Sequence, residues 1–149
     1  MSAIKIEEDL QELPMINGDA AQLKQVFLNV ILNAIEAMQG ERKILTIRST
    51  RVDKEHMVAV EISDTGSGIP PEHMSQIFDP FFTTKRKGTG LGLSVVYGII
   101  NKHHGEIHVQ SKPGEGTTVR IELPTIENVA QNGAREAEFA APRGRIWPS

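Results

Sequence analysis

The sequence predicts an α/β fold, a two-layer sandwich in which a mixed β-sheet carries its helices on one face. Two observations predict it. Segments with strand and helix periodicity follow one another in the order strand, helix, strand, strand, short helix, irregular loop, helix, strand, strand. The helices also lie between pairs of strands, so that all of them can cover one side of the sheet and leave the other partly open.

Five segments alternate apolar and polar residues as half-buried strands do. They are residues 4–8, 43–52, 57–63, 106–110 and 117–123. Val58, Val60 and Ile62 share one face of the third strand, and a Pro-Gly turn joins the last two strands as a hairpin. After Pro124 the periodicity stops. We therefore expect a domain of residues 1–124 and a flexible tail of residues 125–149, rich in Ala, Arg, Gly and Glu.

Three segments are predicted helices: residues 19–39, 72–78 and 91–103. The first begins at Asp19, which resembles a capping box with Gln22 three residues later, and Gly40 is expected to end it. The second is long enough for one or two turns only. In the third, apolar residues recur at helical spacing up to Gly105.

The composition excludes several classes of protein. At 149 residues the chain fits one domain, and its net charge of −3 gives no field that suggests nucleic acid as a partner. The absence of cysteine excludes disulfides, thiolate metal sites and cysteine nucleophiles. No apolar run approaches the ~18 residues of a membrane span, and no signal peptide is present. We expect a soluble, cytoplasmic domain, and the abrupt start on a predicted strand suggests a piece of a longer protein.

The long first helix carries polar residues in an unusual place. At about 100° per residue, five of them fall within a stripe roughly 80° wide. They are Gln22, Gln25, Asn29, Asn33 and Glu36. Apolar residues flank the stripe on both sides, so we expect a mostly buried helix. Its stripe then faces either a hydrogen-bond network in the core or the wall of a ligand pocket, and the helix alone favours neither.

Asp64 directly follows the predicted strand 57–63 and precedes Gly66 and Gly68. This pattern alone is weak evidence, because turns prefer Asp and Gly in any case. The functional interpretation is that a carboxylate held at the strand end accepts a hydrogen bond from an exocyclic amine. The glycines would then let the backbone come close to a flat ring.

Gly88, Gly90 and Gly92 alternate at the start of the predicted helix 91–103. They match neither a P-loop nor the dinucleotide-binding fingerprint. Unshielded backbone N–H groups and the helix dipole nevertheless suit phosphate at such a place. A flexible linker is the alternative, but a regular apolar helix seldom follows one, so phosphate binding is favoured.

The loop before these glycines carries three cations and three aromatic residues. They are Lys85, Arg86 and Lys87, and Phe78, Phe81 and Phe82. A run of three charges is usually solvated surface, but next to a phosphate site one of them can reach the terminal phosphate. We expect the phenylalanines to anchor the loop to the core and leave its centre free to close over a ligand.

The chain has five histidines, His56, His73, His103, His104 and His108. The last three lie close together in the sequence but lack the carboxylate or cysteine neighbours of a strong zinc site. We therefore expect surface or turn histidines.

Five motifs occur together and in one order. They are residues 29–37 (NVILNAIEA), 64–69 (DTGSGI), 78–82 (FDPFF), 88–93 (GTGLGL) and 116–117 (GT). Together they resemble the motifs of the GHKL ATP-binding superfamily, and most of all the catalytic and ATP-binding domain of sensor histidine kinases. The resemblance covers about residues 4–124. It implies the Bergerat-type ATP-binding fold, with a mixed, mostly antiparallel sheet and about three helices on one face.

The resemblance also implies roles for single residues. Asn33 resembles the amide whose oxygen coordinates Mg²⁺ on the ATP phosphates, and Asn29 supports it one turn earlier. Asp64 is similar to the carboxylate that binds the adenine amino group, and Thr117 would complete that contact through water. Lys85 is the expected γ-phosphate contact, with Arg86 or Lys87 as alternatives.

The full set that the resemblance assigns to the nucleotide includes residues of the lid, which is the loop between Phe78 and Gly88, and the glycines around it. It comprises Asn29, Asn33, Glu36, Ala37, Asp64, Gly66, Gly68, Ile69, Phe78, Thr84, Lys85, Gly88, Thr89, Gly90, Leu91, Gly92, Leu93 and Thr117. Asn29, Asn33 and Lys85 are the expected catalytic residues and Asn33 the metal ligand. The position of Glu36 faces the phosphates in the family and varies there.

One position separates the possible activities. Hydrolytic relatives of the gyrase, MutL and Hsp90 types carry a Glu, as general base, where this chain has Asn29. An amide cannot take a proton near neutral pH, which argues for phosphoryl transfer to an imidazole rather than to water. A hydrolytic ATPase and a nucleotide-binding module without phosphotransfer are the alternatives.

The phosphate acceptor is expected outside this chain. In the family it is a His followed by an acidic residue and then by a Pro, on a dimerising helix, and none of the five histidines has that context. The resemblance therefore implies three partners: ATP, the histidine-bearing dimerisation domain of the parent kinase and, indirectly, a response regulator.

Overall fold

The computed structural model describes residues 3–52, 56–79, 92–126 and 144–146. The elements follow one another in the order β1 (Lys5–Leu10), α1 (Ala20–Ala37), β2 (Ile44–Val52), β3 (Met57–Asp64), the 3₁₀ helix η2 (Pro71–Gln76), α2 (Gly92–Lys102), β4 (Glu106–Lys112), β5 (Gly116–Pro124) and β6 (Gly144–Ile146). The strands form one six-stranded sheet in the order β1-β2-β3-β5-β4-β6.

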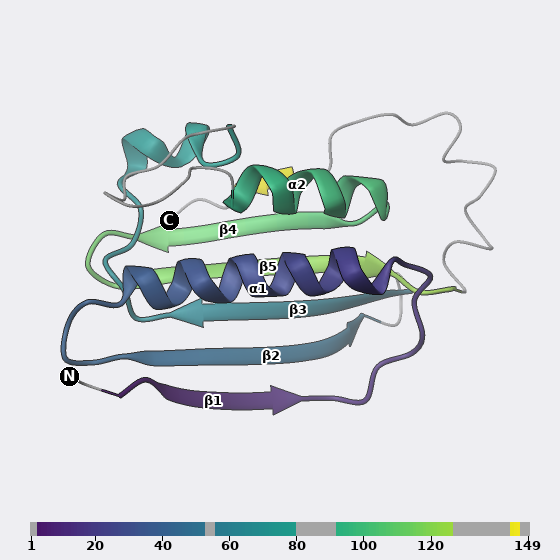
Figure 1. Cartoon of the computed structure of the whole chain (residues 1–149), viewed down its shortest axis with the longest axis horizontal. Helices are drawn as coiled ribbons and strands as arrows, with labels where there is room; N and C mark the ends of the chain where they lie inside the picture. The colour runs from purple at the N-terminus through teal and green to yellow at the C-terminus, as the bar shows by residue number, and fades with distance from the viewer. Residues whose placement is uncertain (1–2, 53–55, 80–91, 127–143, 147–149) are drawn as a thin grey trace.

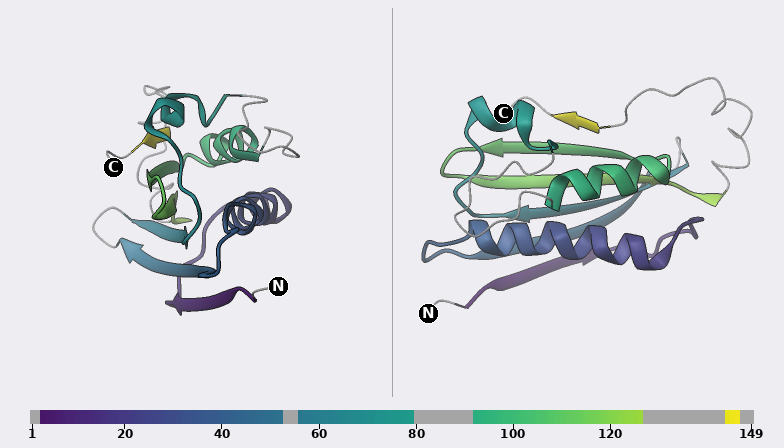
Figure 2. Two further views of the ribbon diagram at one scale, coloured as in Figure 1. Left: turned by 90° about the vertical axis from the view of Figure 1, so that its left-hand side faces the viewer. Right: turned by 45° about the horizontal axis from the view of Figure 1, so that its top comes forward.

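The sheet is mixed and mostly antiparallel. β2 with β3, β3 with β5 and β4 with β5 pair antiparallel, whereas β1 with β2 and β4 with β6 pair parallel. Both α-helices lie side by side on one face of the sheet and run in opposite directions (Figures 1 and 2). The predicted two-layer α/β sandwich with a mixed sheet is confirmed.

The core lies between this helix layer and the sheet. From α1 it takes Val26 and Val30, from α2 Val96 and Ile100, all between 0% and 2% exposed. The sheet contributes the alternate residues of its central strands, Val58 and Ile62, Ile107 and Val109, and Val119, Ile121 and Leu123. The predicted face of Val58 and Ile62 is confirmed.

The expectation that α1 is mostly buried was wrong. Leu28, Leu32 and Ile35 are 57%, 45% and 37% exposed. They follow one another at spacings of four and three residues and so form a stripe on the side of the helix away from the sheet. Apolar character shows what a helix face can pack against, but a helix in a two-layer fold has a sheet on one side only.

The ends of α1 differ in part from the prediction. Asp19 is the N-cap, and its Oδ1 accepts hydrogen bonds from the backbone N–H groups of Ala21 (3.0 Å) and Gln22 (3.2 Å). The backbone N–H of Asp19 donates to Nε2 of His103 (3.0 Å), a partner distant in sequence that takes the role expected for Gln22. The helix ends at Ala37, with Met38 as C-cap, and Gly40 lies beyond it in the loop.

One strand lies in the range expected to be a tail. Residues 144–146 form β6, which pairs parallel with β4 from Ile107 to Val109. Three residues are too few to show an alternating pattern, so this strand could not be predicted from periodicity. Neither α-helix of the described ranges combines the length and the hydropathy that crossing a membrane requires.

Candidate nucleotide-binding site

Four segments of the predicted site meet at one end of the sheet. β3 ends there at Asp64, β4 turns into β5, α1 ends and α2 begins, all toward the left of Figure 1. The antiparallel arrangement of β3, β5 and β4 produces this meeting, because the C-terminal ends of β3 and β4 lie beside the N-terminal end of β5.

The Asp64 carboxylate is held in place by backbone groups from two directions. Its Oδ1 accepts hydrogen bonds from the N–H of Gly66 (2.8 Å) and from the N–H of Thr117 (3.3 Å). The first donor fixes the turn after β3, and the second ties that turn to the start of β5. A carboxylate oriented in this way at a strand end can accept a hydrogen bond from a ligand without paying to become ordered.

Ser111 is a structural centre of the site that the sequence analysis did not single out. It is 2% exposed, and its Oγ accepts a hydrogen bond from Ile69 N–H (2.8 Å) and donates one to the Gly116 carbonyl oxygen (3.0 Å). The same Oγ lies 2.8 Å from Oγ1 of Thr117. One hydroxyl therefore joins the loop after β3 to the β4–β5 hairpin. Ser111 follows Ile107 and Val109, both core residues, at spacings of two along β4. Strand alternation could therefore have predicted that its side chain points inward.

The two glycines after Asp64 make room for the chain itself. A Cβ on Gly66 would lie 2.6 Å from the carbonyl oxygen of Ala37, the last residue of α1. Gly68 has φ +76, and a Cβ there would collide with the backbone of Lys112. The Ser67 N–H donates to the Ala37 carbonyl oxygen at 3.1 Å, so the loop is closed against the end of α1. Glycine is needed here by close packing and by a left-handed backbone.

The start of α2 lies against the polar side of α1. A Cβ on Gly92, the first residue of α2, would lie 2.9 Å from Nδ2 and 3.3 Å from Oδ1 of Asn33. Asn29 and Asn33 are half-buried, and Glu36 is exposed. The polar stripe thus faces a boundary between the two helices. An amide oxygen suits Mg²⁺, which takes oxygen ligands. The N-terminus of α2 beside it attracts an anion, so the two together fit Mg²⁺ bound to phosphate.

Part of the predicted lid can be checked. The Phe78 ring packs on Tyr97 of α2 with the centroids 5.2 Å apart, and both residues contact the core. This is the anchoring that we expected for Phe78. Leu93 is half-buried against the core. Thr84, Lys85, Gly88, Thr89, Gly90 and Leu91 lie outside the described residues, as do Phe81, Phe82, Arg86 and Lys87.

His103 lies in the turn after α2, as expected, and links the two helices, because its Nδ1 donates to the Ile99 carbonyl oxygen (2.8 Å) while Nε2 accepts from Asp19 N–H. His108 differs from the expectation of a surface or turn position. His108 is 5% exposed and does have carboxylate neighbours. Its Nε2 lies 2.8 Å from Glu122 Oε1 and 3.2 Å from Glu106 Oε2. Glu106 is only two residues from His108 in the sequence, but Glu122 comes from the neighbouring strand, so its proximity could not be seen in the sequence.

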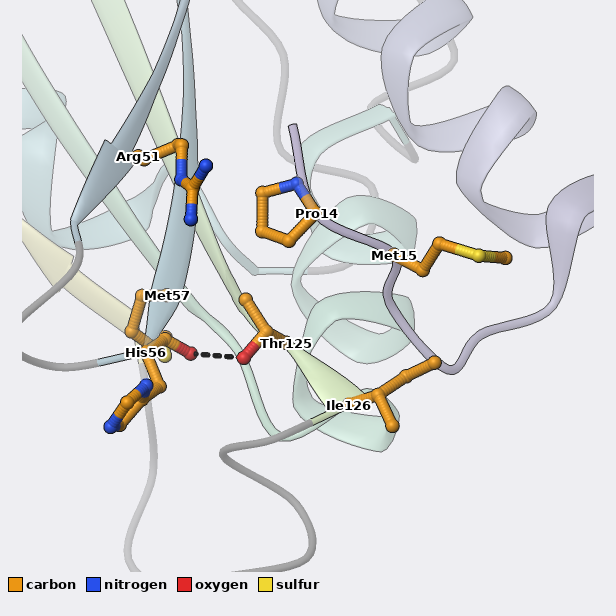
Figure 3. A pocket seen from close by; sticks show the side chains of 7 residues that line it. All are labelled: Pro14, Met15, Arg51, His56, Met57, Thr125 and Ile126. Carbon is orange, nitrogen blue, oxygen red and sulfur yellow. Dashed lines mark hydrogen bonds between the residues drawn. The ribbon is translucent and has the colours of Figure 1, made fainter. Parts of the chain in front are cut away.

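A pocket of about 320 Å³ lies at the opposite end of β3, between Met15, Arg51, His56 and Ile126 (Figure 3). Thr125 closes one wall through a hydrogen bond from its Oγ1 to the His56 carbonyl oxygen (3.0 Å). It shares no residue with the predicted nucleotide site. The described part of that site is a corner formed by four segments: the end of β3, the β4–β5 turn, the end of α1 and the start of α2.

Comparisons with known proteins agree with the fold. Residues 18–146 match the model of the histidine kinase-, DNA gyrase B- and HSP90-like ATPases. The chain is 49% identical to sporulation kinase A of Bacillus subtilis (strain 168) over 109 residues, which are 73% of this chain and 18% of that protein.

Two solved structures have folds similar to that of this chain. The catalytic domain of histidine kinase ThkA is 35% identical with a TM-score of 0.70, covering 82% of this chain and 79% of that one. Full-length ShkA in complex with AMPPNP is 25% identical with a TM-score of 0.71, covering 98% of this chain and 35% of that one.

These matches define the class of protein. The chain belongs to the family of histidine kinase-, DNA gyrase B- and HSP90-like ATPases. Within that family it is a histidine kinase catalytic domain, since its relatives and structural neighbours carry that name. It spans only 18% of the length of sporulation kinase A, so the activity of the whole protein is a matter for proposal.

Proposed function

We propose that this domain binds ATP with Mg²⁺ at the corner between β3, α1, α2 and the β4–β5 turn. It then transfers the γ-phosphoryl group to a histidine on a dimerisation domain of the same kinase, for signalling to a response regulator. The observation that carries the proposal is that Asp64 and Asn33, from different elements, lie at the same end of the sheet. The complex of ShkA with AMPPNP supports it.

In this proposal the Asp64 side recognises the base. Asp64 accepts the hydrogen bond of the adenine amino group, and Thr117 completes the contact through water. The hydrogen bonds from Gly66 and Thr117 to Asp64 support this role, because they hold the carboxylate before the ligand arrives. Gly66, Gly68 and Ile69 lie along the base.

The Asn33 side holds the phosphates. Asn33 is the proposed ligand of Mg²⁺, supported by Asn29 and Glu36 on the same side of α1 and by Ala37 at its end. Bound Mg²⁺ would neutralise the charge that the phosphate oxygens carry. Gly92 and Leu93 begin α2, whose dipole favours an anion there. Thr84, Lys85, Gly88, Thr89, Gly90 and Leu91 would complete this part, with Phe78 anchoring the segment and Lys85 contacting the γ-phosphate.

The acceptor of the phosphoryl group is proposed to be an imidazole rather than water. Asn29 occupies the position at which a hydrolytic enzyme needs a base, and an amide does not take up a proton near neutral pH. The domain would therefore act mainly by positioning and by stabilising charge. We propose that it works in the cytoplasm.

The test is a calorimetric titration with AMPPNP, with and without Mg²⁺, followed by transfer of labelled phosphate from ATP to a supplied acceptor domain. We expect one magnesium-linked site and acceptor-dependent transfer. Asn33→Ala should abolish the transfer, whereas Gln25→Ala, an exposed amide two turns earlier on the same stripe, should not. Wild-type transfer by Asn33→Ala would refute the magnesium role, and steady phosphate release without an acceptor would indicate a hydrolase.

A further inference from the structure

Three ligand-type side chains meet on the face of the sheet opposite to the helices. Ile107 and Val109 of β4 and Ile121 and Leu123 of β5 point into the core, so the residues alternating with them point to the other face. There Glu106 is the cross-strand partner of Glu122, and His108 is the next residue of β4 on the same face.

The register places two carboxylates directly opposite each other. Like charges in this position destabilise a sheet unless a cation lies between them. The backbone pairing of β4 with β5 holds the two strands together here, and they lie so close that a Cβ on Gly105 would be 2.4 Å from the Glu122 carbonyl oxygen. The Glu106 and Glu122 side chains are only 25% and 13% exposed, so water screens the repulsion incompletely.

We propose that Glu106, His108 and Glu122 bind one divalent transition-metal ion of the zinc class, which crosslinks β4 and β5. The three ligand atoms lie within 4.8 Å of one another. His108 Nε2 is 3.2 Å from Glu106 Oε2 and 2.8 Å from Glu122 Oε1. Ligands about 2.0–2.1 Å from a tetrahedral Zn²⁺ lie roughly 3.3 Å apart, so the three side chains need to open by about half an ångström at most on these two edges.

The donor set selects the kind of ion. One imidazole nitrogen and two carboxylate oxygens suit Zn²⁺ and its neighbours, whereas Mg²⁺ and Ca²⁺ prefer oxygen ligands alone. Three protein ligands leave a fourth position for water. Arg120 orients the site from outside: its guanidinium lies 2.9 Å from Glu61 and 3.8 Å from Glu122 Oε1. Glu61 is therefore the closer partner of Arg120.

The site is separate from the nucleotide corner. Glu106 begins β4 and Glu122 lies near the end of β5, whereas the nucleotide corner lies at the opposite ends of both strands, beside Ser111 and Thr117. The proposed metal therefore does not depend on the proposed kinase function, and it can be measured without ATP.

The experiment uses the nucleotide-free chain and titrates it with ZnCl₂ by calorimetry and with CoCl₂ by visible absorption. We expect one ion per chain and, for Co²⁺, the d–d bands of a four-coordinate site. His108→Ala should abolish these bands, and Glu122→Gln, nearly the same size, should weaken binding at least ten-fold. His104→Asn is the control, because His104 is exposed with φ +60, which asparagine tolerates.

Each outcome decides the proposal. Circular dichroism and AMPPNP binding would first establish that the variants fold. Stoichiometric Zn²⁺ binding lost in His108→Ala and kept in His104→Asn supports the site. Three results would overturn it: equal Zn²⁺ binding by all variants, displacement of Zn²⁺ when Mg²⁺ and AMPPNP are added, or no Zn²⁺ binding by the folded wild-type chain. The cluster would then be a histidine–glutamate ion pair only.

Discussion

At the scale of single residues, the candidate site is organised by side chains that bind the backbone of other segments. Asp64 accepts from Gly66 and Thr117, and Ser111 joins Ile69 to Gly116. In both cases one oxygen ties the turn after β3 to the β4–β5 hairpin. The proposed base-binding side of the corner is thus formed before any ligand is present, which lowers the entropic cost of binding.

Asp64→Asn tests the assignment of the adenine contact. The new amide oxygen can still accept from Gly66 and Thr117, so the fold should be kept, but the charge is lost and an NH₂ group cannot accept a hydrogen bond from adenine. A hydrogen bond to a charged group is worth about 1.5–3 kcal/mol, so the Kd for AMPPNP should rise roughly 10- to 100-fold. Calorimetry measures it. Binding of inorganic triphosphate should not change, and an equal loss there would refute the adenine role.

Ser111→Ala tests whether one hydroxyl holds the corner together. The change leaves the partly buried N–H of Ile69 without its acceptor and should cost about 1–3 kcal/mol of unfolding free energy. Affinity for AMPPNP should fall as well, because Ile69 and Thr117 lose their common partner. Urea unfolding and calorimetry measure the two effects. Ser75→Ala in η2, at an exposed position, is the control and should change neither.

At the scale of elements, periodicity predicted which segments are helices and which are strands, but it did not predict what each element packs against. The 3.6-residue pattern located α1 and α2, but it could not say that Leu28 and Leu32 have no sheet to pack against. Strand parity located β4 and β5. The pairing of Glu106 with Glu122 depends on register, which is decided across a hairpin and not within either strand.

His103→Ala tests the link between the two helices. The variant loses the acceptor of Asp19 N–H and the donor to the Ile99 carbonyl oxygen. Water can replace part of these bonds at this exposed end, so we expect a loss of about 1 kcal/mol, or roughly 2–4 °C in Tm for a chain of this size. Scanning calorimetry measures it. Lys102→Ala, an exposed neighbour, is the control, and an equal effect of both variants would contradict the specific link.

At the scale of the whole molecule, the sequence predicted the layers of the fold in advance and proposed which residues form the site. The order of elements was sufficient for the two-layer sandwich, and the motifs named Asp64, Asn33 and Gly92 before the structure brought them to one end. The supporting partners were not predicted, because Ser111 and His103 look like ordinary polar residues until the strands and helices pack. The strand β6 was missed because three residues carry no period.

The two ends of the sheet should behave independently. β3 has eight residues, from Met57, beside the pocket of Figure 3, to Asp64, and its two ends lie about 23 Å apart at ~3.3 Å per residue. Substitutions this far apart with no shared partner usually act additively. The clearest probe at the far end is Thr125, whose Oγ1 donates to the His56 carbonyl oxygen.

Thr125→Val should lower stability without changing nucleotide affinity. Its backbone N–H still donates to the His56 carbonyl oxygen at 2.9 Å, so the lost hydroxyl should cost only about 0.5–1.5 kcal/mol. AMPPNP at a hundred times its Kd should add about 2.7 kcal/mol to the unfolding free energy of both the wild type and this variant. Thermal unfolding with and without Mg²⁺ and AMPPNP measures the increment. In Ser111→Ala the same ligand concentration should add less, because that change lies inside the corner. A smaller increment in Thr125→Val would mean that the ends of the sheet are coupled.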